Sequence, residues 1–144
     1  MIEVRFYDQA DEASFRYAVI VSRHRGKWVL CKHRQRDTLE VPGGHREAGE
    51  DILETARREL VEETGAVEFL IQPVSAYSVI QYDDENVKSE VFGKLFYADI
   101  MRYEDELHNE IEKIVLMDEL PENWTYPLIQ PKLVEKTIEL GFVI

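Results

Sequence analysis

Residues 44–66, with the sequence GHREAGEDILETARRELVEETGA, combine a glycine turn, an amphipathic helix and a cluster of acidic side chains. Helical residues three and four positions apart share a face, so Glu59, Glu62 and Glu63 are expected to project from an arc of about 100°. An apolar stripe beside them, able to pack on a core, consists of Ile52, Ala56 and Leu60. Carboxylates at this spacing repel one another, whereas Mg²⁺ binds one or two carboxylates together with water and phosphate oxygens. The segment therefore predicts a site that holds a divalent metal ion against a phosphorylated substrate.

The ends of this helix are marked in the sequence. Glu50 and Asp51 place acids in the first turn, where the helix dipole favours them, and Gly65 follows the last periodic residue. We therefore predict a helix over residues 51–64. The preceding Pro42–Gly44 is a turn signal, and its glycines allow the backbone to approach a ligand closely.

The alternative interpretation of the glutamates is a charged helix face in solvent, which is what most Glu-rich helices are. The wider pattern argues against chance. At about one in fifteen per position, seven given letters coincide at roughly one in 10⁸ starting positions. The seven are Gly44, Glu50, Arg58, Glu59, Glu62, Glu63 and Gly65.

These letters match every fixed position of the Nudix box, which is Gly, five residues, Glu, seven residues, then Arg-Glu-aliphatic-x-Glu-Glu-x-Gly-aliphatic. Only Ala66 departs, being smaller than the usual aliphatic residue. The chain thus resembles a Nudix hydrolase of the MutT-like type, and the motif covers about a sixth of its length. The resemblance implies an α/β (α+β) fold, a Nudix-type α/β/α sandwich with a mixed β-sheet between helices.

The resemblance also implies roles for single residues. Glu59, Glu62 and Glu63 would bind Mg²⁺ or Mn²⁺ with help from the Gly43 carbonyl, Arg58 would hold the cluster, and Glu50 would support it from outside or act as an indirect ligand. MutT-like enzymes often place a further catalytic glutamate in a loop before a late strand. Glu110 is the preferred residue here, with Glu106 and Glu112 as alternates. The other interpretation of this stretch is an acidic surface loop.

Positive charge and aromatic or amide groups are also needed to bind a nucleotide. The cations that precede the glycine turn and could contact substrate phosphates are Lys32, His33, Arg34 and Arg36. Candidates for the base are Trp124, Asn123, Tyr126, Tyr77 and Tyr82, with Trp124 and Asn123 preferred because some MutT-like proteins recognise the base there. Taken singly, the cations could equally be solvated and the aromatics could belong to the core. His45 could line the cleft, and His24 is expected at the surface.

Composition sets broader limits. The 144 residues suit one domain, taken as residues 1–144, and 44% hydrophobic with 32% charged residues is typical of a soluble globular protein. No signal peptide or membrane span is visible, so a cytoplasmic location is expected. A single cysteine, Cys31, excludes an internal disulfide and is expected to be buried in a strand.

The net charge of −12 disfavours a long nucleic acid as partner, because such binding depends on Lys and Arg neutralising phosphates. A small nucleotide is compatible with it, since bound divalent ions invert the local field. We expect a small-molecule nucleotide substrate, no membrane partner, and a monomer or homodimer.

The rest of the chain predicts strands and one further helix. The helix covers residues 131–140, with Pro131 in its first turn and Gly141 after its end. Strands are expected over residues 15–22, 27–33, 40–41, 67–71, 76–82, 89–100 and 113–117.

The predicted activity is metal-dependent hydrolysis of a nucleoside diphosphate linked to another group. The first candidate substrate is a (deoxy)nucleoside triphosphate, including an oxidised one such as 8-oxo-dGTP, giving nucleoside monophosphate and pyrophosphate. Alternatives with the same chemistry are ADP-ribose, nucleotide sugars, dinucleoside polyphosphates and RNA 5′ ends. An alternative of another class is a non-catalytic regulatory module that binds nucleotides. Such a module is expected to have lost box residues, whereas this chain keeps all the charged ones.

Overall fold

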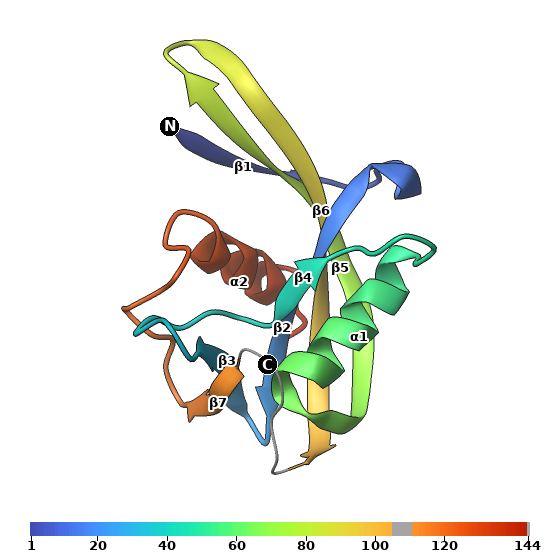
Figure 1. The fold of residues 1–144 in the computed structure, drawn as a ribbon, viewed down its shortest axis with the longest axis vertical. Coiled ribbons are helices and arrows are strands. Elements are labelled where there is room, and N and C mark those ends of the chain that lie inside the picture. The colour runs from blue at the N-terminus through green and yellow to red at the C-terminus, as the bar shows by residue number, and fades with distance from the viewer. Residues whose placement is uncertain (105–110, 144) are drawn as a thin grey trace.

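The computed structural model describes residues 1–104 and 111–143, and of Glu112 only the backbone. Two α-helices flank a sheet (Figure 1), as the α/β sandwich prediction requires. In chain order the elements are β1 (Ile2–Tyr7), the 3₁₀ turn η1 (Glu12–Ser14), β2 (Phe15–His24), β3 (Lys27–His33), β4 (Gly43–His45), α1 (Ile52–Thr64), β5 (Ala66–Asp83), β6 (Asn86–Tyr103), β7 (Ile111–Met117) and α2 (Gln130–Glu139).

Within the described residues, the sheet has seven strands in the order β1-β5-β6-β2-β3-β7, with β4 attached to β2. It is mixed, because β2 and β6 are parallel, with Val19 opposite Leu95, while β1–β5, β5–β6, β2–β3, β2–β4 and β3–β7 are antiparallel. Strands β5 and β6 form a long hairpin that rises above the rest of the molecule at the top of Figure 1, with β1 alongside.

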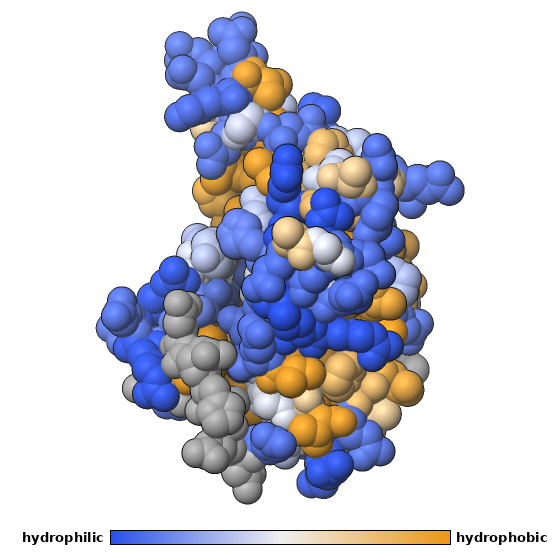
Figure 2. Space-filling view, turned by 45° about the vertical axis from the view of Figure 1, so that its right-hand side comes forward, coloured by the Kyte–Doolittle hydropathy of each residue, from blue (hydrophilic) through white to orange (hydrophobic). Residues whose placement is uncertain are grey.

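Each face of the sheet buries one helix. On one face Ile52, Ala56 and Leu60 of α1 pack in a core that includes Ile20, which confirms the apolar stripe of the sequence. On the other face α2 packs in a second core, whose members include Leu133, Val134 and Val21. Since successive strand residues point to opposite faces, Ile20 and Val21 anchor β2 in both cores at once. The outward surface of α1 is largely hydrophilic (Figure 2).

Helix α1 begins and ends where its sequence signals place it. The Asp51 carboxylate accepts a hydrogen bond from the Glu54 amide at 2.8 Å, and the Glu54 side chain accepts one from the Asp51 amide at 3.4 Å. This capping box satisfies two amides of the first turn. Gly65 closes the other end in the left-handed region, at φ 76°. Helix α2 also lies within one residue of its predicted bounds.

Four details differ from the predicted elements. Strand β1 was not predicted, and residues 67–82 lie in one continuous strand of 18 residues, β5, instead of two. The short strand at 40–41 is only a bridge between Glu40 and Cys31, and the regular pairing comes just after it, at β4. His24, expected at the surface, is buried at 8% exposure because its Nδ1 lies 2.6 Å from the Ile100 carbonyl.

Cys31 is fully buried, as predicted, and burial raises the pKa of its thiol well above the ordinary value. In the described part of the chain, neither helix combines the length and the apolar character needed to cross a bilayer.

Candidate active site

Two glycines of β4 bring the backbone against the acidic face of α1. A Cβ on Gly44 would collide with the carboxylate of Glu59, and a Cβ on Gly43 would lie 2.6 Å from the Ala18 carbonyl of β2. Only glycine fits at these two positions, between β2 and the Glu59 carboxylate. Gly43 and Gly44 therefore allow the Glu59 carboxylate to lie directly against β4.

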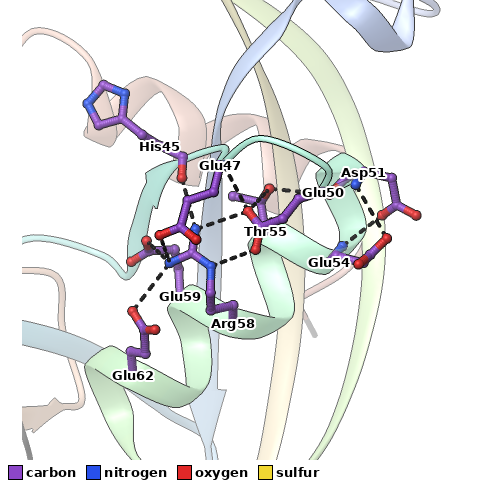
Figure 3. Close-up of polar contacts among 9 residues, drawn as sticks. All are labelled: His45, Glu47, Glu50, Asp51, Glu54, Thr55, Arg58, Glu59 and Glu62. Atoms are coloured by element: carbon purple, nitrogen blue, oxygen red, sulfur yellow. Dashed lines mark hydrogen bonds and ion pairs between the residues drawn. The ribbon is translucent and has the colours of Figure 1, made fainter.

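Arg58 is the centre of the polar network of α1 (Figure 3). Its Nε donates to Glu50 at 2.7 Å, and its Nη1 donates to Glu59 at 2.8 Å and to Glu62 at 3.3 Å. Its Nη2 donates to the His45 carbonyl at 2.9 Å, so Arg58 also ties α1 to β4. Arg58 therefore orients several acids at once, with its shortest bonds to Glu50 and Glu59.

Glu50 is held in its charged form. Besides Arg58, its Oε1 accepts hydrogen bonds from the Glu47 amide at 2.9 Å and from the Thr55 hydroxyl at 3.0 Å. The hydrogen bonds from Arg58 are the main cause that lowers the pKa of Glu50 to about 2. With its oxygens already engaged, Glu50 braces Arg58 and the loop before α1.

Glu63 has the opposite electrostatic environment. Its Oε1 accepts a hydrogen bond from the Gly43 amide at 2.7 Å, and its Oε2 lies 3.7 Å from the Nε2 of His33. Burial above all, together with the nearby Glu59, Glu40 and Glu62 carboxylates, raises the pKa of Glu63 to about 8. Burial likewise raises the pKa of Glu59, although Arg58 opposes the shift. These two carboxylates therefore lie where negative charge is poorly stabilised.

Glu59 and Glu63 line a cleft of about 650 Å³ that opens between β2, β4, β5 and α2. Tyr17 and Val19 of β2 and Tyr77, Val79 and Gln81 of β5 form its sheet wall. Its other lining residues include His33, Arg36, Glu40, Gly43, Gly44, His45, Tyr126, Ile129, Gln130 and Leu133. The volume lies within the range of pockets that hold small ligands.

The box glutamates do not all face this cleft. Glu62 is not among its lining residues, and its side chain is 45% exposed beside Arg58. Across residues 1–104 and 111–143, no three Asp, Glu, His or Cys side chains are grouped closely enough to hold a metal ion as they stand. Arg58 and the Gly43 amide occupy oxygens of the acids that a metal would use. The donor set itself suits a hard divalent cation, since it consists of carboxylate oxygens, and burial raises the pKa of both Glu59 and Glu63.

The structure places only some of the predicted substrate-binding residues in the cleft. Lys32 and Arg34 do not line the cleft, and the Lys32 ammonium lies 3.4 Å from the His33 carbonyl. Trp124 packs against the core on the α2 face, and the Asn123 side chain donates to the Asp37 carbonyl at 3.0 Å. Both hold the loop before α2 in place and lie outside the cleft lining.

Of the other candidates, Arg36, Tyr126, Tyr77 and His45 do line the cleft, whereas Tyr82 does not. Tyr82 instead contacts Glu3 and Arg5 of β1. Glu110 and its alternate Glu106 lie outside the described residues, and for Glu112 only its place in β7 is described.

Sequence reasoning missed several cleft residues. Glu40 is only 8% exposed, and it carried a local signal, since an acid between Leu39 and Val41 sits in an apolar run. Tyr17 carried another, because alternation in β2 puts it on the same face as Val19. Gln81 carried the same signal, because alternation in β5 puts it on the face of Tyr77 and Val79.

Known proteins with similar sequence or structure agree with this geometry. A family model described as the NUDIX domain matches residues 15–135. The Bacillus subtilis (strain 168) protein named "Putative 8-oxo-dGTP diphosphatase YtkD" is 34% identical over 123 residues, which are 85% of this chain and 74% of that protein.

Two solved structures illustrate the range of similarity. The Bacillus subtilis pyrophosphohydrolase BsRppH, solved as a mutant, has a TM-score of 0.80 and 28% identity, covering 99% of this chain and 93% of that one. A MutT protein from Bacillus halodurans has a TM-score of 0.57 and 24% identity, covering 88% and 82%, and shares the fold. With the box, the sandwich and the cleft in place, the chain belongs to the Nudix family and is a Nudix pyrophosphohydrolase.

Proposed function

We propose that this chain hydrolyses a nucleoside triphosphate to a nucleoside monophosphate and pyrophosphate, with Mg²⁺ or Mn²⁺ as cofactor. The observation that carries the proposal is the position of the Glu59 and Glu63 carboxylates on the wall of a nucleotide-sized cleft. The similarity to YtkD, named for 8-oxo-dGTP, supports a purine nucleoside triphosphate, including an oxidised one, as the first substrate to test.

The residues proposed to hold the metal are Glu59, Glu62 and Glu63, with the Gly43 carbonyl. A bound divalent ion would neutralise charge on the phosphates and lower the pKa of a bound water. Arg58, braced by Glu50, holds α1 against β4, so the carboxylates stay beside Gly43 and Gly44. Two of these carboxylates have raised pKa values, which fits a site completed by a cation.

The chemistry is one displacement at phosphorus. Water forms a new P–O bond, the bridging P–O bond breaks, and the bridging oxygen leaves with the other phosphate. The proton released by water passes to a glutamate. Glu110 remains our proposed acceptor, because in the sequence it directly precedes Ile111, the first residue of β7.

A panel assay tests this function. Common and oxidised nucleoside triphosphates, ADP-ribose, nucleotide sugars and dinucleoside polyphosphates are incubated with Mg²⁺, with Mn²⁺ and with EDTA. We expect pyrophosphate release from a triphosphate that stops in EDTA, and a fall in kcat of about 100-fold or more in Glu59→Gln and Glu63→Gln.

Glu68→Gln is the matched control, because Glu68 is 61% exposed on β5 and pairs with Arg102 away from the cleft. Hydrolysis that ignores both EDTA and the two box substitutions would refute the proposal. Tight nucleotide binding without hydrolysis of any compound would instead identify a binding module.

A further inference from the structure

Arg36 is the only lysine or arginine among the described residues that line the cleft. The acidic residues of the lining are Glu40, Glu47, Glu59 and Glu63. A polyphosphate entering this cleft therefore meets one permanently cationic side chain from the described part of the protein. The Arg36 side chain is 45% exposed, so it is accessible from the cleft mouth.

The contacts of Arg36 leave one edge of its guanidinium available. Its Nη1 donates to the buried Glu40 carboxylate at 3.0 Å and lies 3.5 Å from the Tyr126 hydroxyl. Both contacts use the same nitrogen, and the Nε–Nη2 edge has no hydrogen bond to any described residue. That edge has the paired donors that match two oxygens of a phosphate.

The strand order places Arg36 at one end of the cleft. From β5 the sheet runs through β6 and β2 to β4, which spans about 14 Å at a strand spacing of about 4.8 Å. The β5 wall with Val79 and Gln81 lies three strands from β4. Glu40 bridges to Cys31 of β3, on the side of β2 away from β5, and holds Arg36 at that end of the cleft. Glu59 and Glu63 contact β4 between these two ends.

We propose that Arg36, supported by Glu40 and Tyr126, binds the terminal phosphate of the substrate, at the end that leaves as pyrophosphate. The cleft thereby selects nucleotides with a free terminal phosphate over those in which a sugar, a second nucleoside or an ester covers it. This inference rests on the proposed function, whose substrate class it specifies. The competing explanation is that Arg36 only neutralises the Glu40 carboxylate, in which case its loss affects all substrates equally.

The test compares GTP with its γ-methyl ester, which has one negative charge fewer and the same bond to be cleaved. In Arg36→Gln we expect kcat/KM for GTP to fall about 10- to 100-fold, as the loss of a hydrogen bond between charged groups predicts. The terminal phosphate of the ester keeps two unesterified oxygens but has one negative charge fewer, so we expect a smaller fall of about 3- to 10-fold. Arg36→Lys keeps the charge without the fork and is expected to fall in between. Arg102→Gln, at a site 70% exposed on β6, is the control.

A binding experiment separates this inference from the proposed function. The non-hydrolysable α,β-methylene-GTP and GMP are titrated into the wild type and Arg36→Gln. Weaker binding of the triphosphate analogue with unchanged binding of GMP supports the role of Arg36. This holds even if the wild type hydrolyses neither GTP nor its ester and the proposed function fails. Equal losses for GTP and its ester, or equal losses for the analogue and GMP, would overturn the role of Arg36 alone.

Discussion

Replacement of Glu63 by Gln should stabilise the metal-free protein at alkaline pH. The Glu63 carboxylate is buried beside Glu59 and Glu40, and its pKa is raised from 4.5 to about 8. Gln has the same shape, and its carbonyl oxygen can still accept the hydrogen bond from the Gly43 amide. The substitution thus removes the buried charge and keeps the local contacts.

The size of the effect follows from proton linkage. Because the folded protein binds this proton more tightly than the unfolded chain, the contribution of Glu63 to stability is fully present below pH 4.5 and is lost as the pH rises through about 8. Each pKa unit corresponds to about 1.4 kcal/mol. Between pH 6 and pH 9 the wild type should lose roughly 2–3 kcal/mol of unfolding free energy relative to Glu63→Gln, as an upper bound.

Urea unfolding in EDTA at both pH values measures this difference directly. The same experiment with Mg²⁺ or Mn²⁺ should reverse the ranking at pH 9, since a cation that binds the folded state stabilises the wild type more than the variant. If the unfolding free energies of the wild type and Glu63→Gln change identically with pH in EDTA, the buried charge of Glu63 does not destabilise the protein and the reasoning fails.

Three further substitutions test the packing and the caps. Gly44→Ala puts a Cβ into the Glu59 carboxylate, so kcat/KM should fall about 10-fold or more while circular dichroism stays native; full activity would contradict the close approach. Asp51→Ala removes the capping box of α1 and should cost about 1 kcal/mol in urea unfolding, and an unchanged midpoint would show that the cap is not needed. Gly93→Ala places a Cβ 2.6 Å from the ring of the buried Tyr77 and should cost about 1–3 kcal/mol, which a thermal melt at native stability would refute.

The elements that the sequence predicted correctly depend on local interactions. The bounds of α1 follow from Asp51 and Gly65, whose side chain and backbone conformation act within one helical turn. The burial of Cys31 likewise follows from its place in an apolar strand. Such features need no knowledge of the rest of the fold.

The features that were missed depend on partners far along the chain. Strand β1 is formed by pairing with β5, where Ile2 lies opposite Gln81. His24 looked like a surface residue in a polar hairpin, yet it is buried because Ile100 of β6 supplies an acceptor for its ring nitrogen. The preference for Trp124 and Asn123 over Tyr126 is of the same kind, since the bridge between Leu39 and Trp124 decides which residue of that loop reaches the cleft.

The carboxylates of the Nudix box separate into two groups by their electrostatics. Glu50 lies in a network of donors that keeps it charged without any ligand, so its pKa is about 2. Glu59 and Glu63 face the cleft, and burial raises their pKa values, so their charged forms need a partner that the described residues supply only in part. A structural acid satisfies its charge inside the fold, whereas a ligand-binding acid leaves that charge to be satisfied by what binds. The opposite shifts within one motif therefore support the proposed division of roles, in which Glu50 belongs to the scaffold while Glu59 and Glu63 bind the cation.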